Sequence, residues 1–203
     1  DVAALLVQKA RGVVDVNQAM AETGCTPLLL ACHNGHTRVV ALLLDDPRID
    51  VNKATANSEW ANVYGCSPLY SACQEGHADV VELLLDKAQA TLDVNKAQTR
   101  NGSTPLLVAC GVGNVKVVAL LLDKARDKLD VNRALTTNGS TPLFLACQEG
   151  HTALVELLLD KAGDTLEVNR PQTSSRATAL YVACQNGHSD VVALLLDKAR
   201  VKI

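Results

Sequence analysis

Four cysteines each precede a histidine at the spacing Cys-x3-His, and these pairs are the first residues in the sequence that could carry chemistry. They are Cys32 with His36, Cys73 with His77, Cys147 with His151 and Cys184 with His188. Thiolate and imidazole both bind zinc, but a structural zinc site needs about four convergent ligands. Each unit supplies only two, so we predict no metal site and no cofactor. We expect the histidines to hold the turn between two helices.

The same pairs could also serve as nucleophile and base, since an adjacent imidazole activates a thiol. An active site is normally a unique constellation, whereas these pairs recur in near-identical surroundings. No glycine-rich loop follows a strand-like segment either. We therefore expect no catalytic residues and no enzymatic activity. Two Asn-Gly-Ser triplets, at 101–103 and 138–140, match the glycosylation acceptor pattern, but Asn-Gly favours a tight turn, and we prefer the turn.

The elements that position these residues recur along the chain. With the cysteines at 32, 73, 110, 147 and 184 as markers, the spacing is 41 residues once and then 37 three times. Each marker lies in the same kind of segment, such as TPLLLACHNGHTRVVALLLD from residue 26. The first Thr or Ser is typical of a helix N-cap, proline follows in four of five units, and glycine ends the short helix.

Valine and leucine at helical spacing then predict a second helix, and D-V-N or E-V-N leads into a polar stretch. Asn-Gly in two of these stretches predicts a hairpin turn. We therefore predict an all-α repeat solenoid of stacked helix-turn-helix units with short β-hairpin fingers. It forms one domain over 1–203. We divide it into a partial repeat, 1–14, and the repeats 15–49, 50–92, 93–129, 130–166 and 167–203.

The motif T-P-L-x-x-A-C-x-x-G-H, followed by V-V-x-L-L-L and D-V-N, resembles the ankyrin repeat family over nearly the whole chain. The period of 37 residues departs from the family's period of about 33. The histidine usual after T-P-L is replaced by Leu29, Tyr70, Leu107, Phe144 and Tyr181. The resemblance implies stacked helix pairs with projecting fingers. It also implies non-catalytic binding of another protein on the concave face that fingers and first helices form.

Composition excludes several other classes. The net charge of −3 gives no long-range attraction for nucleic acid, and no apolar run of about 18 residues predicts membrane insertion. Equivalent cysteines in stacked helices lie about 10 Å apart, too far for a disulfide, which needs Cα atoms within about 7 Å. Buried free thiols are the simplest interpretation, and they favour an intracellular, cytoplasmic location.

Matched charges follow the second helices, as in Asp86-Lys87 and Asp123-Lys124. We expect the aspartate of one repeat to lie near the lysine of the next, on a solvated edge. Such exposed pairs are each worth about 0–1 kcal/mol.

Residues that differ between repeats are free to recognise a partner. One set follows Ala-Cys on the first helices, and we predict these partner-binding residues: His33, Asn34, Gln74, Glu75, Gln148, Glu149, Gln185 and Asn186. The other lies in the finger 53–66, six residues longer than the others, with Glu59, Trp60 and Tyr64. Tryptophan and tyrosine are enriched among interface hot spots. Trp60 could instead cover an apolar gap between neighbouring fingers.

The two ends of the repeat array lack the polar outer faces that terminal repeats normally carry. We therefore expect either end-to-end self-association or continuation in a longer repeat array. Two further classes remain open, an engineered repeat scaffold and a targeting or scaffolding segment of a larger multidomain protein. The irregular step of 41 residues and the seven cysteines argue against an engineered scaffold.

Overall fold

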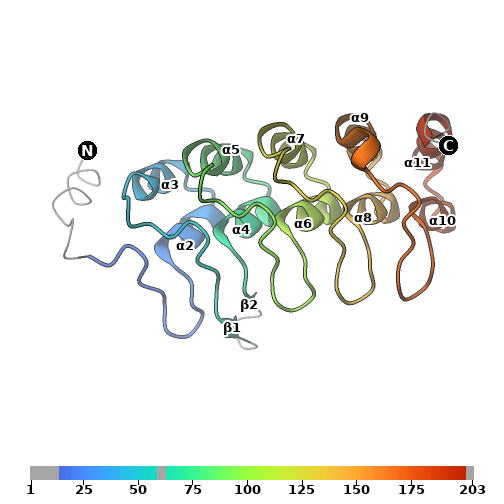
Figure 1. Cartoon of the computed structure of the whole chain (residues 1–203). Helices are drawn as coiled ribbons and strands as arrows, with labels where there is room; N and C mark the ends of the chain where they lie inside the picture. Colours follow the sequence, from blue (N-terminus) through green and yellow to red (C-terminus); the bar gives the residue numbers. More distant parts are fainter. Residues whose placement is uncertain (1–13, 59–62, 200–203) are drawn as a thin grey trace.

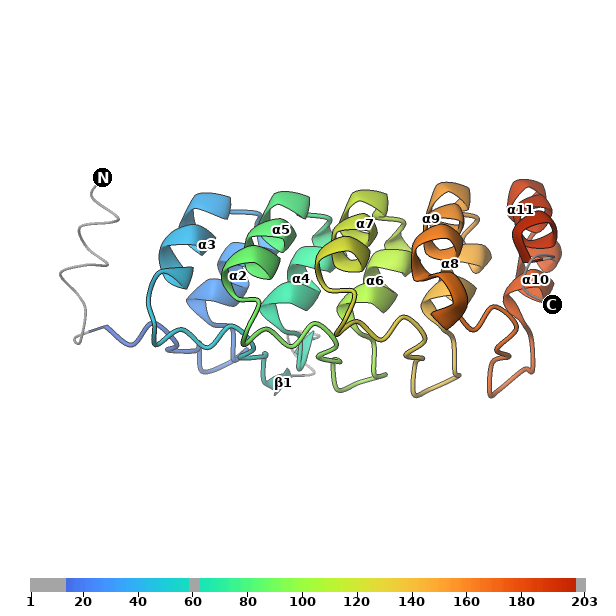
Figure 2. The same ribbon diagram turned by 45° about the horizontal axis from the view of Figure 1, so that its top comes forward.

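A computed structural model describes residues 14–58 and 63–199. The first helices of the units pack in one row and the second helices in another, and the fingers project to one side (Figures 1 and 2). The first helices are α2 (Pro27–His33), α4 (Pro68–Glu75), α6 (Pro105–Val112), α8 (Pro142–Gln148) and α10 (Ala179–Gln185). The second helices are α3 (Thr37–Leu44), α5 (Ala78–Lys87), α7 (Val115–Lys124), α9 (Thr152–Ala162) and α11 (Ser189–Ala199), and a short 3-10 turn, η1 (Gly163–Thr165), follows α9. The predicted all-α repeat solenoid is confirmed.

The predicted ends of the first helices are also confirmed. In every unit the Thr or Ser hydroxyl accepts a hydrogen bond from an amide of the first turn, as Thr104 does from Leu107 at 3.2 Å. This contact satisfies one of the amides that have no partner within the helix. A glycine with positive φ then ends each first helix, as Gly113 does at +81°. The turn thus reverses the chain so that the second helix packs back on the first.

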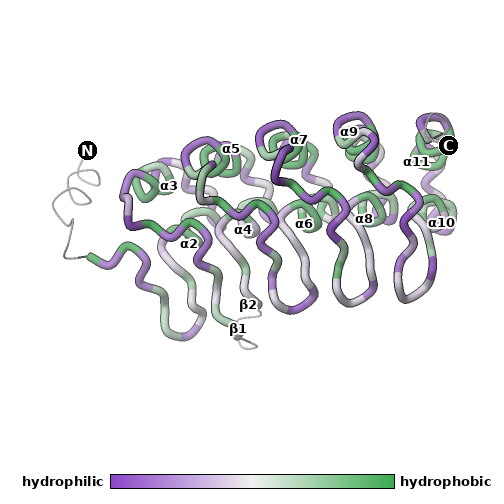
Figure 3. The backbone as a smooth tube through the Cα atoms, in the orientation of Figure 1, coloured by the Kyte–Doolittle hydropathy of each residue, from purple (hydrophilic) through white to green (hydrophobic). Residues whose placement is uncertain are grey.

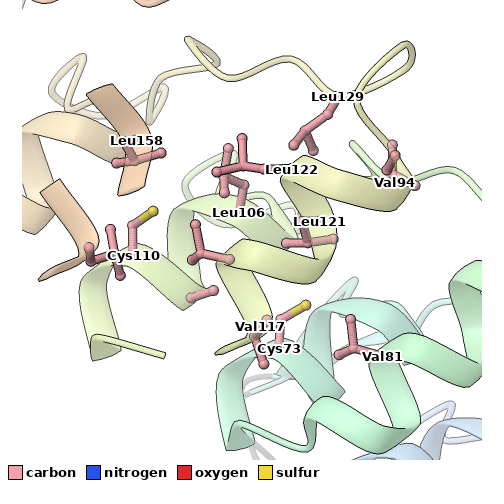
Figure 4. Packing of buried hydrophobic residues seen from close by; sticks show 14 of the residues in the cluster. Cys73, Val81, Val94, Leu106, Cys110, Val117, Leu121, Leu122, Leu129 and Leu158 are labelled. Atoms are coloured by element: carbon pink, nitrogen blue, oxygen red, sulfur yellow. The ribbon is translucent and has the colours of Figure 1, made fainter. Parts of the chain in front are cut away.

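The core is a continuous row of Leu, Val, Ala and Cys side chains shared by neighbouring repeats. Figure 4 shows Cys73 and Cys110 among leucines and valines of this cluster. Leu121 and Leu158, equivalent residues of α7 and α9, are completely buried. Because each helix packs against its counterparts in the adjoining repeats, most of the stabilising burial lies between repeats. A single repeat is therefore not an independent folding unit.

An asparagine ladder joins the segments after the second helices. The Asn95 side chain donates to Lys128 O at 2.6 Å and accepts from Asp130 N at 2.9 Å. Equivalent pairs of bonds are made by Asn17, Asn52 and Asn132. Each amide therefore uses its donor and its acceptor to fix the next repeat, a role that the recurring D-V-N motif did not reveal.

The predicted charge ladder is present on the second helices. Lys87 pairs with Asp45 at 2.6 Å, Lys124 with Asp86 at 2.7 Å, and the pairs Lys161–Asp123 and Lys198–Asp160 follow the same pattern. The hydrogen bond to Asp86 raises the pKa of Lys124. Figure 3 shows the hydrophilic outer side of the second helices, on which these exposed pairs lie.

The β-hairpin fingers are not confirmed as a general feature. One two-residue pair of antiparallel strands is assigned among the described residues, β1 (Asn57–Ser58) with β2 (Val63–Tyr64). The finger 96–103 is instead closed by bonds from Gln98 N to Ser103 O and from Gly102 N to Gln98 O. Its tip bonds to the next finger, since Thr136 N donates to Asn101 O at 2.8 Å. Backbone groups near the tips thus link neighbouring fingers as well as the two sides of one finger.

Candidate functional site

The predicted residues on the first helices form one row, because they occupy equivalent positions in successive repeats. Neighbours within the row contact one another: His33 Nδ1 lies 3.8 Å from Glu75 Oε1, and Gln74 Nε2 donates to the same carboxylate oxygen at 3.1 Å. Gln148 is half-buried, and the other predicted residues of the row are exposed. The row therefore presents polar groups along the stack at the ends of the first helices.

At the carboxyl-terminal end of this row the surface is hollowed. Gln148, from α8, and Gln185, from α10, line a pocket of about 490 Å³ together with residues of the finger 170–177. The pocket also includes Arg176 and Tyr181. Asn186 Nδ2 donates to Gln148 O at 2.8 Å and so connects the two helices beside it. The structure thus brings two predicted residues together at the junction of finger and first helices.

Arg176 and Tyr181 were not predicted as partner-binding residues. Arg176 has φ of +61°, which is unusual for a residue with a side chain, and it takes the place of a glycine in the earlier fingers. Tyr181 is 60% exposed. The sequence signal for Arg176 was the departure of the last unit from the repeat, where Arg176-Ala177 replaces the Gly-Ser of the two units before it.

The finger 53–66 is described only in part. Glu59 and Trp60 lie outside the described residues, so their predicted role is still a prediction. Tyr64 is half-buried, and the Arg100 guanidinium lies over its ring at 4.8 Å from the centroid. Tyr64 O also accepts from Thr99 N at 2.6 Å. The long finger is therefore joined to the next one by a backbone bond and by a cation–π contact.

The Cys-x3-His pairs do not act as units, because the histidine rings of three of the four pairs contact the preceding repeat. His77 Nε2 lies 2.9 Å from His33 O, and His188 Nε2 lies 2.9 Å from Gln148 O. The sequence predicts that these rings hold a turn between two helices. The turn they contact belongs to the preceding repeat, where the last carbonyls of the first helix have no partner within the helix. Asn114 replaces the histidine in one unit and bonds to Cys73 O at 3.0 Å.

The four buried thiols of the ladder are poor nucleophiles and poor metal ligands. All seven cysteines are free, and the four at positions 32, 73, 110 and 147 are buried. Burial raises the pKa of Cys32 and of Cys147 to about 12 and raises that of Cys73 and Cys110 as well. Cys184 is exposed, contrary to the expectation that the whole ladder is buried, because no described helix covers α10 on its outer side. Within 14–58 and 63–199 no cluster of three or more His, Cys, Asp or Glu side chains could hold a metal ion.

The comparison with protein families agrees with the repeated geometry. A family model described as ankyrin repeats (3 copies) matches residues 1–97, 54–134, 90–171 and 126–203. No curated protein matches the chain. Members of the matched family are generally protein–protein interaction modules and are typically non-catalytic. In the described part of the chain, no helix is long and apolar enough to cross a bilayer. Because the matches together cover all 203 residues, the chain belongs to the ankyrin repeat family.

Proposed function

We propose that this protein is a non-catalytic binding module that holds a protein partner on the concave face formed by its fingers and first helices. The observation that carries the proposal is the pocket of about 490 Å³ between the finger 170–177 and the helices α8 and α10. Its lining combines the amides of Gln148 and Gln185 with an exposed aromatic ring, Tyr181. A hollow with an aromatic wall and a few convergent polar groups suits a side chain of a partner.

The proposed face includes the predicted row from His33 to Asn186 and the long finger with Glu59, Trp60 and Tyr64. The free state of all seven cysteines supports work in a reducing, intracellular compartment. We also propose that 1–203 acts as one domain with the repeat boundaries predicted above. Support comes from the core, since one cluster of buried side chains runs from α2 to α11.

Replacing Trp60 with alanine is expected to reduce partner capture at least about tenfold, because an interface tryptophan often contributes more than 1.4 kcal/mol. The measurement is quantitative mass spectrometry of proteins captured from a cell lysate. Baits are the unchanged chain, Trp60→Ala, the chain with the finger 53–66 shortened to eight residues, and the double variant Gln148→Ala with Gln185→Ala.

The matched control is Arg126→Ala, an exposed side chain outside the proposed face. Equal thermal stability of Trp60→Ala and the unchanged chain excludes loss of folding as the cause. Identical partner lists from the unchanged chain and both finger variants would assign Trp60 to packing between fingers. If the double variant also kept every partner, the concave-face proposal would be wrong.

We further propose that the outer side of α10 and α11 mediates self-association. Side chains that are covered in the preceding repeat are exposed here: Tyr181 is 60% exposed where Phe144 is 3% exposed, and Leu196 is 49% exposed where Leu159 is 5% exposed. The equivalent side chains of two earlier repeats are buried as well, namely Tyr70 and Leu107 for Tyr181, and Leu85 and Leu122 for Leu196. This surface thus continues an interface that the molecule already uses.

Arg176 favours a second copy of the chain, rather than a further regular repeat, as the partner that covers the outer side of α10 and α11. At the equivalent Gly139, an added Cβ would lie 2.7 Å from Thr173 N of the following finger. Arg176 carries such a side chain, so a finger could not follow it at the regular distance. A second copy needs no finger in that position and can still cover Tyr181 and Leu196.

Light scattering is expected to show a mass that rises with concentration from 21.5 kDa towards twice that value. Leu196→Asp should abolish the rise, because a buried carboxylate without a partner is strongly unfavourable. Leu30→Asp, on the exposed side of α2 (51% exposed), serves as the matched variant at the other end. If both variants abolish the rise in mass, the contact is head-to-tail. If Leu196→Asp alone abolishes it, the contact is tail-to-tail. A constant monomer mass for the unchanged chain contradicts self-association.

A further inference from the structure

The charges of the molecule are unevenly distributed between fingers and helices. The described finger residues carry these cationic side chains: Lys53, Lys96, Arg100, Arg133, Arg170 and Arg176. Among the described finger residues, Glu22 is the only one with a carboxylate side chain. Because the whole chain has a net charge of −3, the helices and the segments after them are acidic. The fingers are thus a cationic edge on an acidic molecule.

Four of these cations form a regular row. Lys53, Lys96, Arg133 and Arg170 each follow the D-V-N or E-V-N motif directly, so they occupy equivalent positions in four successive repeats. Backbone bonds between neighbouring fingers, such as Thr173 N to Asn138 O at 2.9 Å, keep the fingers side by side (Figure 1). Packed helices lie about 10 Å apart, so the row presents one cation about every 10 Å.

The fingers differ from the second helices in how their cations are neutralised. Each lysine of the helix ladder, such as Lys124, pairs with an aspartate of the preceding repeat. On the fingers, the side chains of Lys96, Arg133 and Arg176 make no hydrogen bond or ion pair with any other residue of the described ranges.

Two of the remaining finger cations, Lys53 and Arg170, donate to backbone carbonyl groups. Lys53 donates to Asn17 O at 3.0 Å, and Arg100 lies over the ring of Tyr64. Arg170 donates to Asn132 O and also to the carboxylate of Glu167, each at 3.1 Å. A lysine has three donors and an arginine five, so Lys53 and Arg170 keep donors for a ligand.

We propose that the finger row binds an extended, acidic polypeptide segment of the partner, with one carboxylate opposite each finger. A segment in the polyproline II conformation has three residues per turn and rises about 3.1 Å per residue, so every third side chain lies on the same side and meets the next finger. A segment with Asp or Glu at every third position fits this spacing. The inference rests on the proposed function and specifies the chemistry of the partner.

Nucleic acid fits the row less well. Duplex DNA carries a charge about every 1.7 Å, far denser than one cation per finger, and the acidic remainder of the molecule repels it. Proteins that bind single strands add aromatic platforms on which bases stack, whereas Arg100 already covers the ring of Tyr64. The sequence does not reveal this row, because these cations are far apart along the chain and are brought together only by stacking.

The test uses a fluorescent peptide of repeated Glu-Gly-Ser triplets as the probe, with repeated Gln-Gly-Ser triplets and oligothymidine as the comparison ligands. Fluorescence anisotropy is measured at about 50 mM and about 300 mM salt, since screening weakens exposed ion pairs. We expect the glutamate peptide to bind and its affinity to fall with salt. The triple variant Lys96→Gln, Arg133→Gln and Arg176→Gln should bind it about tenfold more weakly.

The matched control removes the same charge from the second helices, through Lys87→Gln, Lys124→Gln and Lys161→Gln. It should weaken binding less than about threefold, because these lysines already have carboxylate partners. Equal losses from the two triple variants, no binding of the glutamate peptide, or tighter binding of oligothymidine would each overturn the proposal. If partner capture still depended on Trp60 or on Gln148 and Gln185, the proposed function would stand and only the acidic preference would fall.

Discussion

Raising the pH from 7 to 10 is expected to lower the free energy of unfolding by about 8 kcal/mol through the four buried thiols, if they ionise independently. In the folded chain, burial holds the pKa of Cys32 and Cys147 at about 12 and raises that of Cys73 and Cys110. In the unfolded chain a thiol ionises near pH 8.5. Above that pH the folded state binds more protons than the unfolded state, so stability falls as pH rises.

These pKa values determine whether stability rises or falls with pH, and over which pH range it changes. The stabilisation by neutral thiols is fully present below about pH 8.5 and is lost progressively as the pH rises towards 12. At pH 10 each buried thiol accounts for about 2 kcal/mol of the loss. Since a domain is typically stable by about 5–15 kcal/mol in total, the thiols alone bring the protein close to its unfolding midpoint.

Urea unfolding followed by circular dichroism, at pH 7 and at pH 10 with a phosphine reductant, measures the effect. Cys110→Ala should reduce the difference between the two pH values by about 2 kcal/mol, whatever it costs in packing at pH 7. Cys184→Ala is the matched control, because Cys184 holds the same ladder position but is exposed. Equal pH dependence in the two variants would show that buried thiols do not control the alkaline transition.

The features that the sequence predicted correctly lie within one repeat or repeat identically in the next. Thr104 caps its own helix, and Gly113 ends the same helix eight residues after it begins. Such signals are local, because each depends on backbone groups within a few residues. The pairing of Lys124 with Asp86 was also predictable, since a strict repeat places the Asp-Lys motifs side by side.

The features that the sequence did not reveal are hydrogen bonds between repeats. They depend on which group of the next repeat lies closest to a given polar atom. Asn95 could have hydrogen-bonded within its own loop, but its amide bridges to Lys128 and Asp130. Asn101-Gly102 predicted a hairpin, yet the Asn101 carbonyl accepts from Thr136 of the next finger. The same limit applies to the candidate site. The residues proposed in the row from His33 to Asn186 follow from variation between repeats, whereas the role proposed for Arg176 depends on the packing of the fingers.

Gly139→Ala is expected to destabilise the protein by about 3 kcal/mol. Gly139 has φ of +77°, a conformation that costs a residue with a side chain about 1–2 kcal/mol. The added Cβ would also lie 2.7 Å from Thr173 N and 2.9 Å from the Thr173 Oγ1. Because the first of these atoms is backbone, no side-chain rotation relieves the contact. The next finger must move, and the bond from Thr173 N to Asn138 O, worth about 0.5–1.5 kcal/mol, is lost.

Two other positions with positive φ separate the backbone cost of that conformation from the cost of the clash with the next finger. Gly187 has φ of +76° with no atom within 4 Å of an added Cβ, so Gly187→Ala should cost only the backbone term, about 1 kcal/mol. Arg176 takes the place of Gly139 in the last finger, where no described finger packs against it, and Arg176→Gly should stabilise by up to about 1 kcal/mol. Urea denaturation of the three variants measures the differences. Equal costs for Gly139→Ala and Gly187→Ala would show that the fingers can separate without penalty, so that contact between fingers is not what requires glycine at the tips.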